Sequence, residues 1–319
     1  MGHPIEAHGL VKHFGSLAAL DRLDLTVEAG SVHGFLGPNG SGKSTTIRAL
    51  LGLYHLDGGH MRVLGQNPAT DAATINRSVA YVPGEVSLWP AFSGQQVLDA
   101  IAGLRGVRDV ARERELIERF ALDPTKRVRT YSTGNRRKVV LVAAFAAPVD
   151  VLLLDEPTSG LDPLMENIFR QCVQEVRQAG KTVLLSSHIL SEVQELCTDV
   201  TIIRDGKTVE AGPLDHLRHL AARQIRLSGP PAQLAQFERG LAALREELAT
   251  SSSDRATPVV SLPIGAATSD GDDGLVVEAS GSVVPRVLEL AVKSGLADIT
   301  CTPASLEDLF LRHYQAVAR

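Results

Sequence analysis

Runs of apolar residues alternate with helical stretches along the first two thirds of this chain. Three of the runs are short: 151–154 and 182–185 are almost continuously apolar, and 32–36, which includes His33 and Gly34, leads into a glycine-rich segment. A strand that is apolar on both faces is typical of a parallel sheet covered by helices on each side. The pattern therefore predicts an α/β domain with a largely parallel sheet, which we place at residues 1–220.

A polar helical insertion interrupts this alternation. Residues 95–119 have helical periodicity and many Arg and Glu residues, and we expect a helical subdomain over about residues 85–147. The most apolar stretch, residues 139–147, is followed by Pro148 and Asp150. Since a membrane-spanning helix needs about 20 apolar residues, this stretch predicts a buried helix followed by a buried strand.

The pattern changes after residue 220. Apolar residues at helical spacing predict an amphipathic helix: Leu234, Phe237, Leu241, Leu244 and Leu248. Segments rich in Ser, Thr, Asp and Gly at 250–254 and 266–274 predict mobile loops within about 250–274. Strands are expected at 259–264, 275–279 and 299–302, a helix at 283–290, and a final helix capped by Ser305 and Asp308. With a further strand beginning near Ile225, residues 221–319 are therefore predicted to form a small β-α-β-β-α-β-α domain.

Composition narrows the class of protein. Of the 319 residues, 44% are hydrophobic and 22% are charged, which is typical of a globular chain of roughly two domains. The net charge of −5 argues against a general nucleic-acid binder, which needs a dominant basic field. Three widely spaced cysteines form no disulfide framework or metal motif, and they favour a reducing cytosol.

A glycine-rich loop follows the first apolar run and precedes a helical stretch. It fits G-x-x-x-x-G-K-[ST], with residues Gly37, Pro38, Asn39, Gly40, Ser41, Gly42, Lys43 and Ser44. Glycines let backbone N–H groups surround a phosphate, and the helix N-terminus adds positive charge. Lys43 would reach the β- and γ-phosphates, and Ser44 would bind Mg²⁺. The alternative is an ordinary glycine-rich turn, which the strand–loop–helix context disfavours.

An acidic pair follows the second apolar run. Asp155 and Glu156 lie at the carboxyl end of the predicted strand, where open α/β sheets bind ligands. Asp155 suits Mg²⁺, directly or through water, and Glu156 suits a base or an orienting group for an attacking water. The pair is weak evidence alone. Together with the phosphate loop it indicates a nucleotide triphosphatase.

Three further segments point to one family. Residues 131–135, Tyr-Ser-Thr-Gly-Asn, precede an apolar helix about 20 residues before Asp155; residues 157–162, Pro-Thr-Ser-Gly-Leu-Asp, follow Glu156; and Ser-Ser-His ends at His188. In this order the five segments resemble the phosphate loop, signature, acidic strand, D-loop and switch histidine of the ABC ATPases. The resemblance covers roughly residues 5–217. It implies a P-loop NTPase fold of ABC type, with a RecA-like core, the helical subdomain and an antiparallel β subdomain.

The resemblance also implies how the site works. Two such domains pair head to tail around two ATP molecules, and Ser132 and Gly134 of one subunit face the phosphate loop of the other. His188 contacts the γ-phosphate and holds the water near Glu156. Taken alone, Ser132 and Gly134 favour a helix cap, and a lone histidine such as His188 is more often a packed bystander.

Several residues complete the site that the resemblance implies. ATP is expected to contact the phosphate loop from Gly37 to Ser44, then Thr45 and Thr46, and the signature residues. Phe14 either stacks on adenine or belongs to the core of the first strand. Arg136, Arg137 and Lys138 follow the signature, and they either touch phosphate or form a solvated helix face.

The sequence departs from the family at two places. The family has Gln after Tyr-x-Pro in a loop that touches Mg²⁺ and senses the membrane partner, whereas here Gly84 and then Glu85 follow Pro83. Glycine has no side chain to bind the metal, and whether Glu85 replaces it stays open. The signature differs from Leu-Ser-Gly-Gly-Gln at its first, third and fifth positions. Because Lys43, Asp155, Glu156 and His188 all match, an active hydrolase is expected.

The resemblance implies a motor subunit that couples ATP hydrolysis to a separate multi-span permease at the cytoplasmic face of the membrane. The chain's end, with residues 303–310, resembles the bacterial drug- and antibiotic-exporter branch, so drug efflux by a homodimeric ATPase is the main expectation. The C-terminal domain is expected to brace the dimer or regulate it. Two alternatives remain: an ABC transporter for lipid, polysaccharide or metal ion, and a soluble ABC ATPase. The single phosphate loop and the absence of sustained heptads disfavour the soluble ATPase. No nucleic-acid partner is expected.

Overall fold

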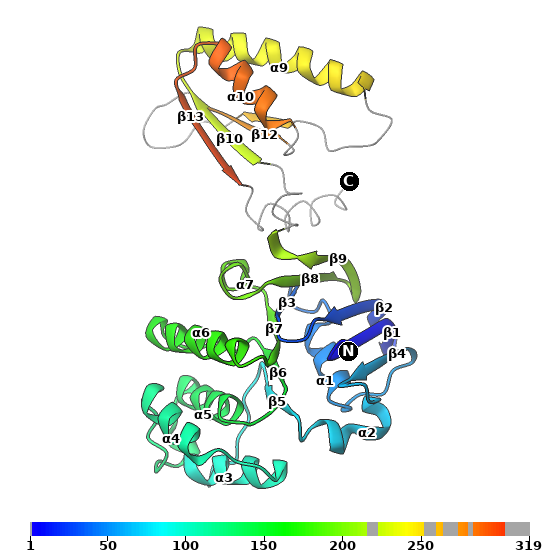
Figure 1. Ribbon diagram of the computed structural model, residues 1–319, viewed down its shortest axis with the longest axis vertical. Coiled ribbons are helices and arrows are strands. Elements are labelled where there is room, and N and C mark those ends of the chain that lie inside the picture. Colours follow the sequence, from blue (N-terminus) through cyan, green and yellow to red (C-terminus); the bar gives the residue numbers. More distant parts are fainter. Residues whose placement is uncertain (1, 216–222, 252–259, 264–273, 280–282, 304–319) are drawn as a thin grey trace. The chain divides into compact units, whose positions relative to one another are not determined.

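The computed structural model describes residues 2–215, 223–251, 260–263, 274–279 and 283–303 (Figure 1). The chain divides into two compact units, Met1–Leu214 and Asp215–Arg319. The expected boundary at Leu220 and the expected final helix with Ser305 and Asp308 lie outside the described residues. So does most of the region predicted to form mobile loops.

A six-stranded sheet is the centre of the first unit. Its order is β5-β6-β7-β3-β8-β9, and all neighbours are parallel except the β8–β9 pair. The strands are β3 (Val32–Leu36), β5 (Val79–Val82), β6 (Val151–Asp155), β7 (Thr182–Ser187), β8 (Asp199–Arg204) and β9 (Lys207–Pro213). The three apolar runs form β3, β6 and β7, which confirms the predicted parallel sheet. These strands are buried along their whole length because both faces of the sheet are covered.

The two faces of this sheet are covered by different structures (Figure 1). Helices cover one face: α5 (Thr133–Phe145), α6 (Pro163–Gln178) and α7 (Leu190–Leu196). The other face packs against α1 (Lys43–Leu50) and an antiparallel sheet, ordered β2-β1-β4. Its strands are β1 (Ile5–Phe14), β2 (Leu17–Val27) and β4 (Gly58–Val63), and α2 (Pro68–Ile75) packs beside β4. This sheet is the antiparallel β subdomain that the resemblance implied.

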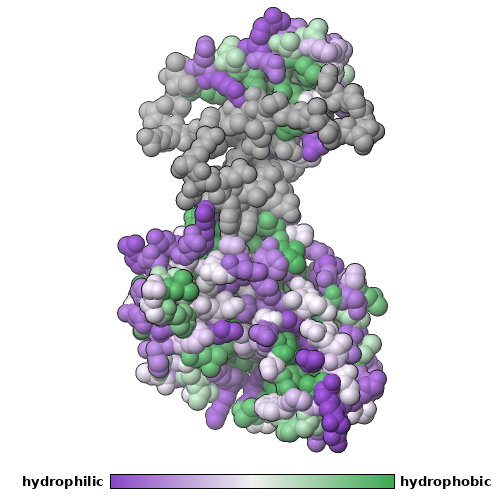
Figure 2. All heavy atoms as spheres, turned by 180° about the vertical axis from the view of Figure 1, so that it is seen from behind, coloured by the Kyte–Doolittle hydropathy of each residue, from purple (hydrophilic) through white to green (hydrophobic). Residues whose placement is uncertain are grey.

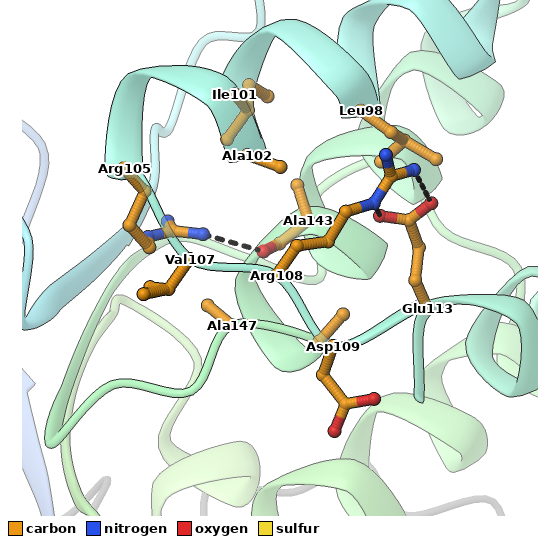
Figure 3. Close-up of a pocket in the computed structure, with 11 residues that line it drawn as sticks. Leu98, Ile101, Ala102, Arg105, Val107, Arg108, Asp109, Glu113, Ala143 and Ala147 are labelled. Carbon is orange, nitrogen blue, oxygen red and sulfur yellow. Dashed lines mark hydrogen bonds and ion pairs between the residues drawn. The ribbon is translucent and has the colours of Figure 1, made fainter. Parts of the chain in front are cut away.

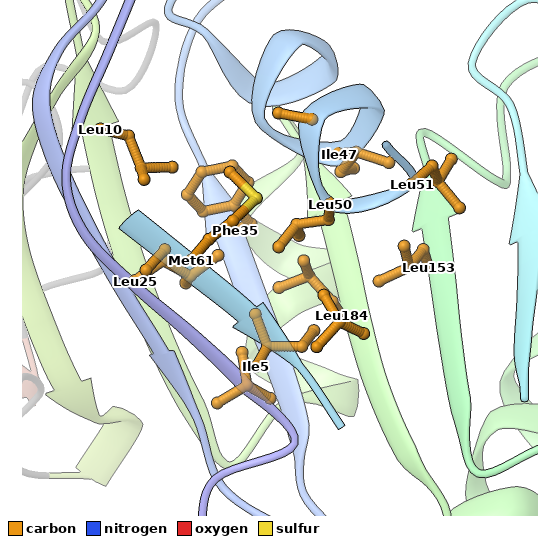
Figure 4. Close-up of a cluster of buried hydrophobic side chains, with 14 of the residues drawn as sticks. Ile5, Leu10, Leu25, Phe35, Ile47, Leu50, Leu51, Met61, Leu153 and Leu184 are labelled. Atoms are coloured by element: carbon orange, nitrogen blue, oxygen red, sulfur yellow. The ribbon is translucent and has the colours of Figure 1, made fainter. Parts of the chain in front are cut away.

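One hydrophobic core lies between the two sheets and α1. Figure 4 shows Phe35 of β3 facing side chains of the antiparallel sheet, among them Leu10, Leu25 and Met61. Ile47 of α1 joins the same buried cluster. Because α1 begins at the phosphate loop, burial of its apolar face against both sheets fixes the position of that loop.

The polar insertion folds as helices, as predicted. It contains α3 (Gly94–Arg105), α4 (Val110–Arg119) and the short 3₁₀ helix η1 (Val128–Thr130), and α3 and α4 both pack on α5. Ser93 and Gln96 form a capping box that begins α3. A small pocket lies between these helices, where the guanidinium of Arg108 pairs with Glu113 at 2.6 Å (Figure 3). This pair joins the segment after α3 to α4.

The second unit is a small α+β domain, as predicted. Its antiparallel sheet has the order β11-β12-β10-β13. The elements are β10 (Arg223–Ser228), α9 (Pro231–Ser251), β11 (Val260–Pro263), β12 (Gly274–Ala279), α10 (Val284–Lys293) and β13 (Asp298–Pro303). Phe237 and Leu241 of α9 are buried in a separate core with Ile225 and Val277 of the sheet. The unit therefore carries its own hydrophobic core.

Hydrophilic and hydrophobic residues are interspersed over the described face of the first unit in Figure 2. Within the described ranges, no helix combines the length and the apolar composition needed to cross a bilayer. The stretch at 139–147 is instead a buried part of α5 and the turn after it, followed by the buried strand β6. All three cysteines are free thiols, which agrees with the absence of a disulfide framework.

Candidate functional site

The phosphate loop connects β3 to α1, as the sequence predicted. Two of its glycines have no room for a side chain. A Cβ atom at Gly37 would lie 2.4 Å from Ser41 Oγ and 2.6 Å from the Ile203 carbonyl oxygen. Gly42 caps α1 with a φ of 110°, which is strained for any other residue, and a Cβ there would lie 2.9 Å from the Ala19 carbonyl oxygen. The glycines thus allow the tight turn that aims the N-terminus of α1 at the loop.

Lys43 is the first residue of α1, and its side chain folds back over the loop. The Nζ atom donates to the carbonyl oxygens of Gly37 at 2.6 Å and Pro38 at 3.0 Å. It also lies 3.7 Å from Glu156 Oε1. Burial lowers the pKa of Lys43, and the carboxylates of Glu156 and Asp155 oppose that shift. The ammonium is therefore held where a bound phosphate would compete with the two carbonyls for it.

The other predicted nucleotide contacts in this loop differ in exposure. Asn39 and Gly40 are exposed at its tip, and Pro38 is half-buried. Ser44 and Thr45 are half-buried at the start of α1. Thr46 is buried, and its hydroxyl donates to the Gly42 carbonyl oxygen at 3.0 Å. In this structure Thr46 stabilises the first turn of the helix.

The acidic pair lies at the end of β6, next to β7. Asp155 is only 1% exposed, and its Oδ1 accepts a 2.5 Å hydrogen bond from Ser186 Oγ. Glu156 follows with a φ of 45°, a left-handed conformation that costs a non-glycine residue about 1 kcal/mol or more. Its amide nitrogen donates to the Ser186 carbonyl oxygen at 3.1 Å, which helps to hold this turn. The strained backbone directs the Glu156 side chain away from the strand.

Glu156 Oε1 is the point where the predicted catalytic residues meet. His188 Nδ1 lies 3.2 Å from this oxygen, and Lys43 Nζ lies 3.7 Å from it on the phosphate-loop side. The His188 side chain is about half exposed. The structure therefore brings Lys43, Glu156 and His188 together from three separate segments. A carboxylate between an imidazole and an ammonium is suited to orient and deprotonate a water molecule.

Sequence reasoning missed Ser186, which contacts the acidic pair, and the buried Glu192, which binds the neighbouring Ser187. Ser186 binds Asp155 through its hydroxyl and Glu156 through its main chain. Glu192, buried on α7, accepts a 2.6 Å hydrogen bond from Ser187 Oγ. Burial raises the pKa of Glu192, and the Ser187 and Thr158 hydroxyls oppose that shift. The only sequence signals were the serine pair before His188 and the acidic residue four positions after it.

The signature segment begins α5. Ser132 caps the helix by accepting a 3.2 Å hydrogen bond from the Asn135 amide, which is the capping role that its type alone suggested. A Cβ atom at Gly134 would lie 2.9 Å from the Gly160 carbonyl oxygen. Gly134 is therefore needed for the approach of the loop at 157–162. Tyr131 departs from the family's leucine; it is buried, and its hydroxyl donates to the Asp123 carbonyl oxygen at 2.6 Å.

Arg137 behaves differently from both alternatives drawn from the sequence. It is 3% exposed, so it does not belong to a solvated helix face. Its Nη1 and Nη2 atoms donate to the carbonyl oxygens of Pro83 at 2.6 Å and Gly84 at 2.5 Å. These are the residues where the family's glutamine is missing. The guanidinium thus binds main-chain carbonyl groups, whereas the sequence had suggested phosphate as one possible partner.

Phe14 and Glu85 lie on the surface. Phe14, at the end of β1, is 43% exposed and packs edge-to-face against Tyr54 with ring centroids 5.3 Å apart. It is therefore not a core residue, and its exposed ring leaves the stacking role available. Glu85 is exposed on the loop after β5. Adenine stacking by Phe14 stays a prediction.

The donor groups fit a magnesium–nucleotide complex. No cluster of three or more His, Cys, Asp or Glu side chains suited to a metal exists in the part of the chain that is described. Mg²⁺ does not require one, because it is usually held by one or two protein oxygens together with phosphates and water. Asp155 at the end of β6 and the Ser44 hydroxyl in the first turn of α1 would supply such oxygens.

Comparison with known proteins agrees with this geometry. Residues 20–159 match the family model described as ABC transporter. The daunorubicin/doxorubicin resistance ATP-binding protein DrrA of Streptomyces peucetius is 39% identical over 246 residues, which cover 75% of this chain and 74% of that protein. This chain belongs to the ATP-binding proteins of ABC transporters. The family predicted from the motifs is therefore confirmed, and so is its ATPase activity.

Another relative and a solved structure are similar to larger parts of the chain than the family model covers. The Nod factor export ATP-binding protein I of Burkholderia lata is 30% identical over 316 residues, covering 97% of this chain and 96% of that protein. A solved structure described as the ATP binding subunit of an ABC transporter has a TM-score of 0.63 and 28% identity, covering 67% of this chain and 91% of that one. These matches confirm the predicted fold. Proteins of this family are ATP-binding subunits of membrane transporters.

Proposed function

We propose that this ABC ATPase powers the export of a drug or antibiotic through a separate membrane permease. The observation that best supports ATP hydrolysis is that two side chains meet at Glu156 Oε1 beside the phosphate loop. His188 lies 3.2 Å and Lys43 lies 3.7 Å from this oxygen. The resistance relative DrrA and the export relative supply the direction and the class of cargo. The match to a Nod factor export protein over 97% of this chain makes a cargo of that kind the second candidate. The ATPase residues do not distinguish the two, because in this proposal the permease contacts the cargo.

In this proposal each residue has a defined task. The loop from Gly37 to Ser44 binds the phosphates through its main-chain N–H groups, and Lys43 exchanges its carbonyl partners for phosphate oxygens. Mg²⁺, held by Ser44 and Asp155, would neutralise charge on the phosphates. Glu156 accepts a proton from the attacking water. His188, whose Nδ1 lies 3.2 Å from Glu156 Oε1, orients that carboxylate.

The signature residues complete the site of a second copy. Ser132 is exposed and Gly134 is half-buried at the N-terminus of α5. The hydroxyl and the N-terminal amides of this helix are suited to receive the γ-phosphate of ATP bound to the partner. The ATPase therefore works as a pair of subunits, and a homodimer is the simplest form.

An exposed aromatic pair marks the surface proposed for the permease. Trp89 and Phe92 lie between Gly84 and α3, 49% and 39% exposed, with ring centroids 5.4 Å apart. Adjacent exposed aromatic rings are typical of protein interfaces. Docking here would hold the subunit at the cytoplasmic face of the membrane. The C-terminal unit, which we place after Leu214, would brace or regulate the dimer.

The test is to purify tagged Glu156→Gln from its native host in mild detergent with ATP and Mg²⁺. The variant should bind ATP but lose turnover by about a hundredfold, so it holds the ATP-bound complex. A co-purifying multi-span membrane protein supports the proposal, and its identity narrows the cargo. Lys43→Ala is the matched control, because weaker ATP binding should reduce the recovery of that partner. Ribosomes or repair proteins as the main partners would contradict the transport role.

A further inference from the structure

The loop after β5 is held by a buried arginine where the family uses a glutamine side chain. Gly84 leaves that position without a side chain. The guanidinium of Arg137, on the helix that begins with the signature, instead donates to the two successive carbonyl oxygens of Pro83 and Gly84. Charge-assisted hydrogen bonds in a forked pair fix both distance and direction. The loop is therefore tied to α5 through its main chain.

This arginine is unusual in its surroundings. Within the described residues it forms no ion pair with a carboxylate, and its Nε atom has no hydrogen-bond partner. Burial lowers the pKa of Arg137, whereas the Asp155 and Glu156 carboxylates attract its charge and oppose that shift. Burying a cation without a paired anion is costly. A buried charge that binds the loop and is attracted by the two nucleotide-site carboxylates indicates a role beyond packing.

Gly84 lies directly beside the metal-side carboxylate. A Cβ atom added at Gly84 would be 3.3 Å from Asp155 Oδ2. A change at Asp155 on nucleotide binding would therefore reach the Gly84 backbone without a side chain in between. Arg137, which belongs to α5, binds the carbonyl oxygen of the same residue, Gly84.

The far end of the loop is tied to η1, the short helix that precedes the signature segment. The amide of Val128 donates to the Phe92 carbonyl oxygen at 2.9 Å, and the amide of Arg129 donates to the Pro90 carbonyl oxygen at 3.1 Å. The exposed Trp89 lies between these bonds and the Arg137 contacts. The loop is thus joined at one end to α5 and at the other end to η1, on either side of the signature segment.

We propose that Arg137 is a positioning residue that couples the nucleotide site at Asp155 and Glu156 to the loop bearing Trp89, by holding the carbonyl groups of Pro83 and Gly84. It acts through the main chain of the loop, because Gly84 has no side chain of its own. The inference rests on the proposed ATPase function. It names a residue that would link the nucleotide site to the loop although Gly84 has no side chain to do so.

The chain contains one tryptophan, so its fluorescence reports on this loop alone. The experiment titrates full-length Glu156→Gln with ATP and Mg²⁺ and records Trp89 emission, while calorimetry measures ATP affinity separately. Arg137→Met is added to remove both hydrogen bonds. ATP affinity should stay within about threefold, whereas the ATP-induced change in emission should fall about tenfold, because charge-assisted bonds are lost. Arg137→Lys, which keeps the charge but not the fork, should give an intermediate change.

Lys138→Met is the matched control, because it removes the same charge from the next position of α5. It should leave the Trp89 response unchanged. A full response in Arg137→Met would overturn the inference, as would an unchanged emission on ATP binding in the Glu156→Gln parent. Loss of ATP binding in a folded Arg137→Met protein would make Arg137 a binding residue and would also overturn it. If Arg137→Met does not fold, Arg137→Lys decides between the same outcomes. Failure of the parent to bind ATP would count against the proposed function instead.

Discussion

At the residue scale, a buried histidine is expected to change how the stability of the protein depends on pH. His33 lies on β3 with 4% of its surface exposed, and its Nε2 atom is 2.8 Å from Thr201 Oγ1 on β8. Burial lowers the pKa of His33 to about 4, from an ordinary value of 6.5. The folded protein therefore keeps this ring neutral at pH values where the unfolded chain protonates it.

This difference predicts how stability depends on pH. Above pH 6.5 His33 is neutral in both states and has no effect. As pH falls from 6.5 toward 4, the unfolded chain gains a proton that the folded one does not, so the free energy of unfolding falls by up to about 3 kcal/mol. We expect His33→Gln to have a flatter profile of urea-unfolding free energy in that range. The exposed His55→Gln variant is the control. A His33→Gln profile as steep as wild type would contradict the assignment.

At the element scale, the loop from β5 to α3 and the start of α5 act as one assembly. The capping box begins α3, main-chain bonds join the loop to the segment of η1, and Arg137 joins it to α5. Each of these contacts comes from a different stretch of sequence. The position of the aromatic pair therefore depends on contacts from all of these stretches.

The pair gives a prediction for this element. Replacing Trp89 and Phe92 together by Ala should leave ATP turnover of the isolated subunit within about twofold, because neither ring contacts the catalytic cluster. Binding to the permease recovered with Glu156→Gln should fall about tenfold or more, as expected for central aromatic residues of an interface. Pull-down in detergent measures this loss. Val110→Ala, an exposed position on α4, is the control. Undiminished permease binding by the double variant would place the docking surface elsewhere.

At the scale of the whole molecule, the two units have separate cores. The catalytic residues all lie before Leu214, and their core is formed by the two sheets and α1. The second unit buries Phe237, Ile225 and Val277 in its own cluster. Catalysis and the C-terminal function are therefore expected to be separable.

Truncation after Leu214 tests this separation. The remaining chain should unfold cooperatively and bind ATP with an affinity within about threefold of the full chain, because no described catalytic contact is removed. Circular dichroism during thermal unfolding and calorimetric ATP titration measure the two properties. Dimerisation of the truncated and full chains then shows whether the second unit braces the pair. A truncated chain that is unfolded, or that no longer binds ATP, would show that the units depend on each other.

The sequence determined the secondary structure and most of the catalytic cluster by itself. Continuous apolar runs predicted β3, β6 and β7, because a strand covered on both faces must be apolar throughout. Lys43, Asp155 and Glu156 were predicted because phosphate loops and strand-end carboxylates have fixed local spacing. His188 was predicted only through the resemblance to the ABC ATPases. Even the small C-terminal domain followed from periodicity, with the order of its described elements as predicted.

Only the tertiary structure decided what depends on contacts between distant segments. Arg137 looked like one of three adjacent basic residues, and only the packing of α5 against the loop after β5 shows that it holds Pro83 and Gly84. Gly134 matched a signature, but its need for a missing Cβ comes from Gly160. Local patterns report which elements form, because they depend on near neighbours. Which side chains meet is set by how those elements pack, and no spacing along the chain encodes it.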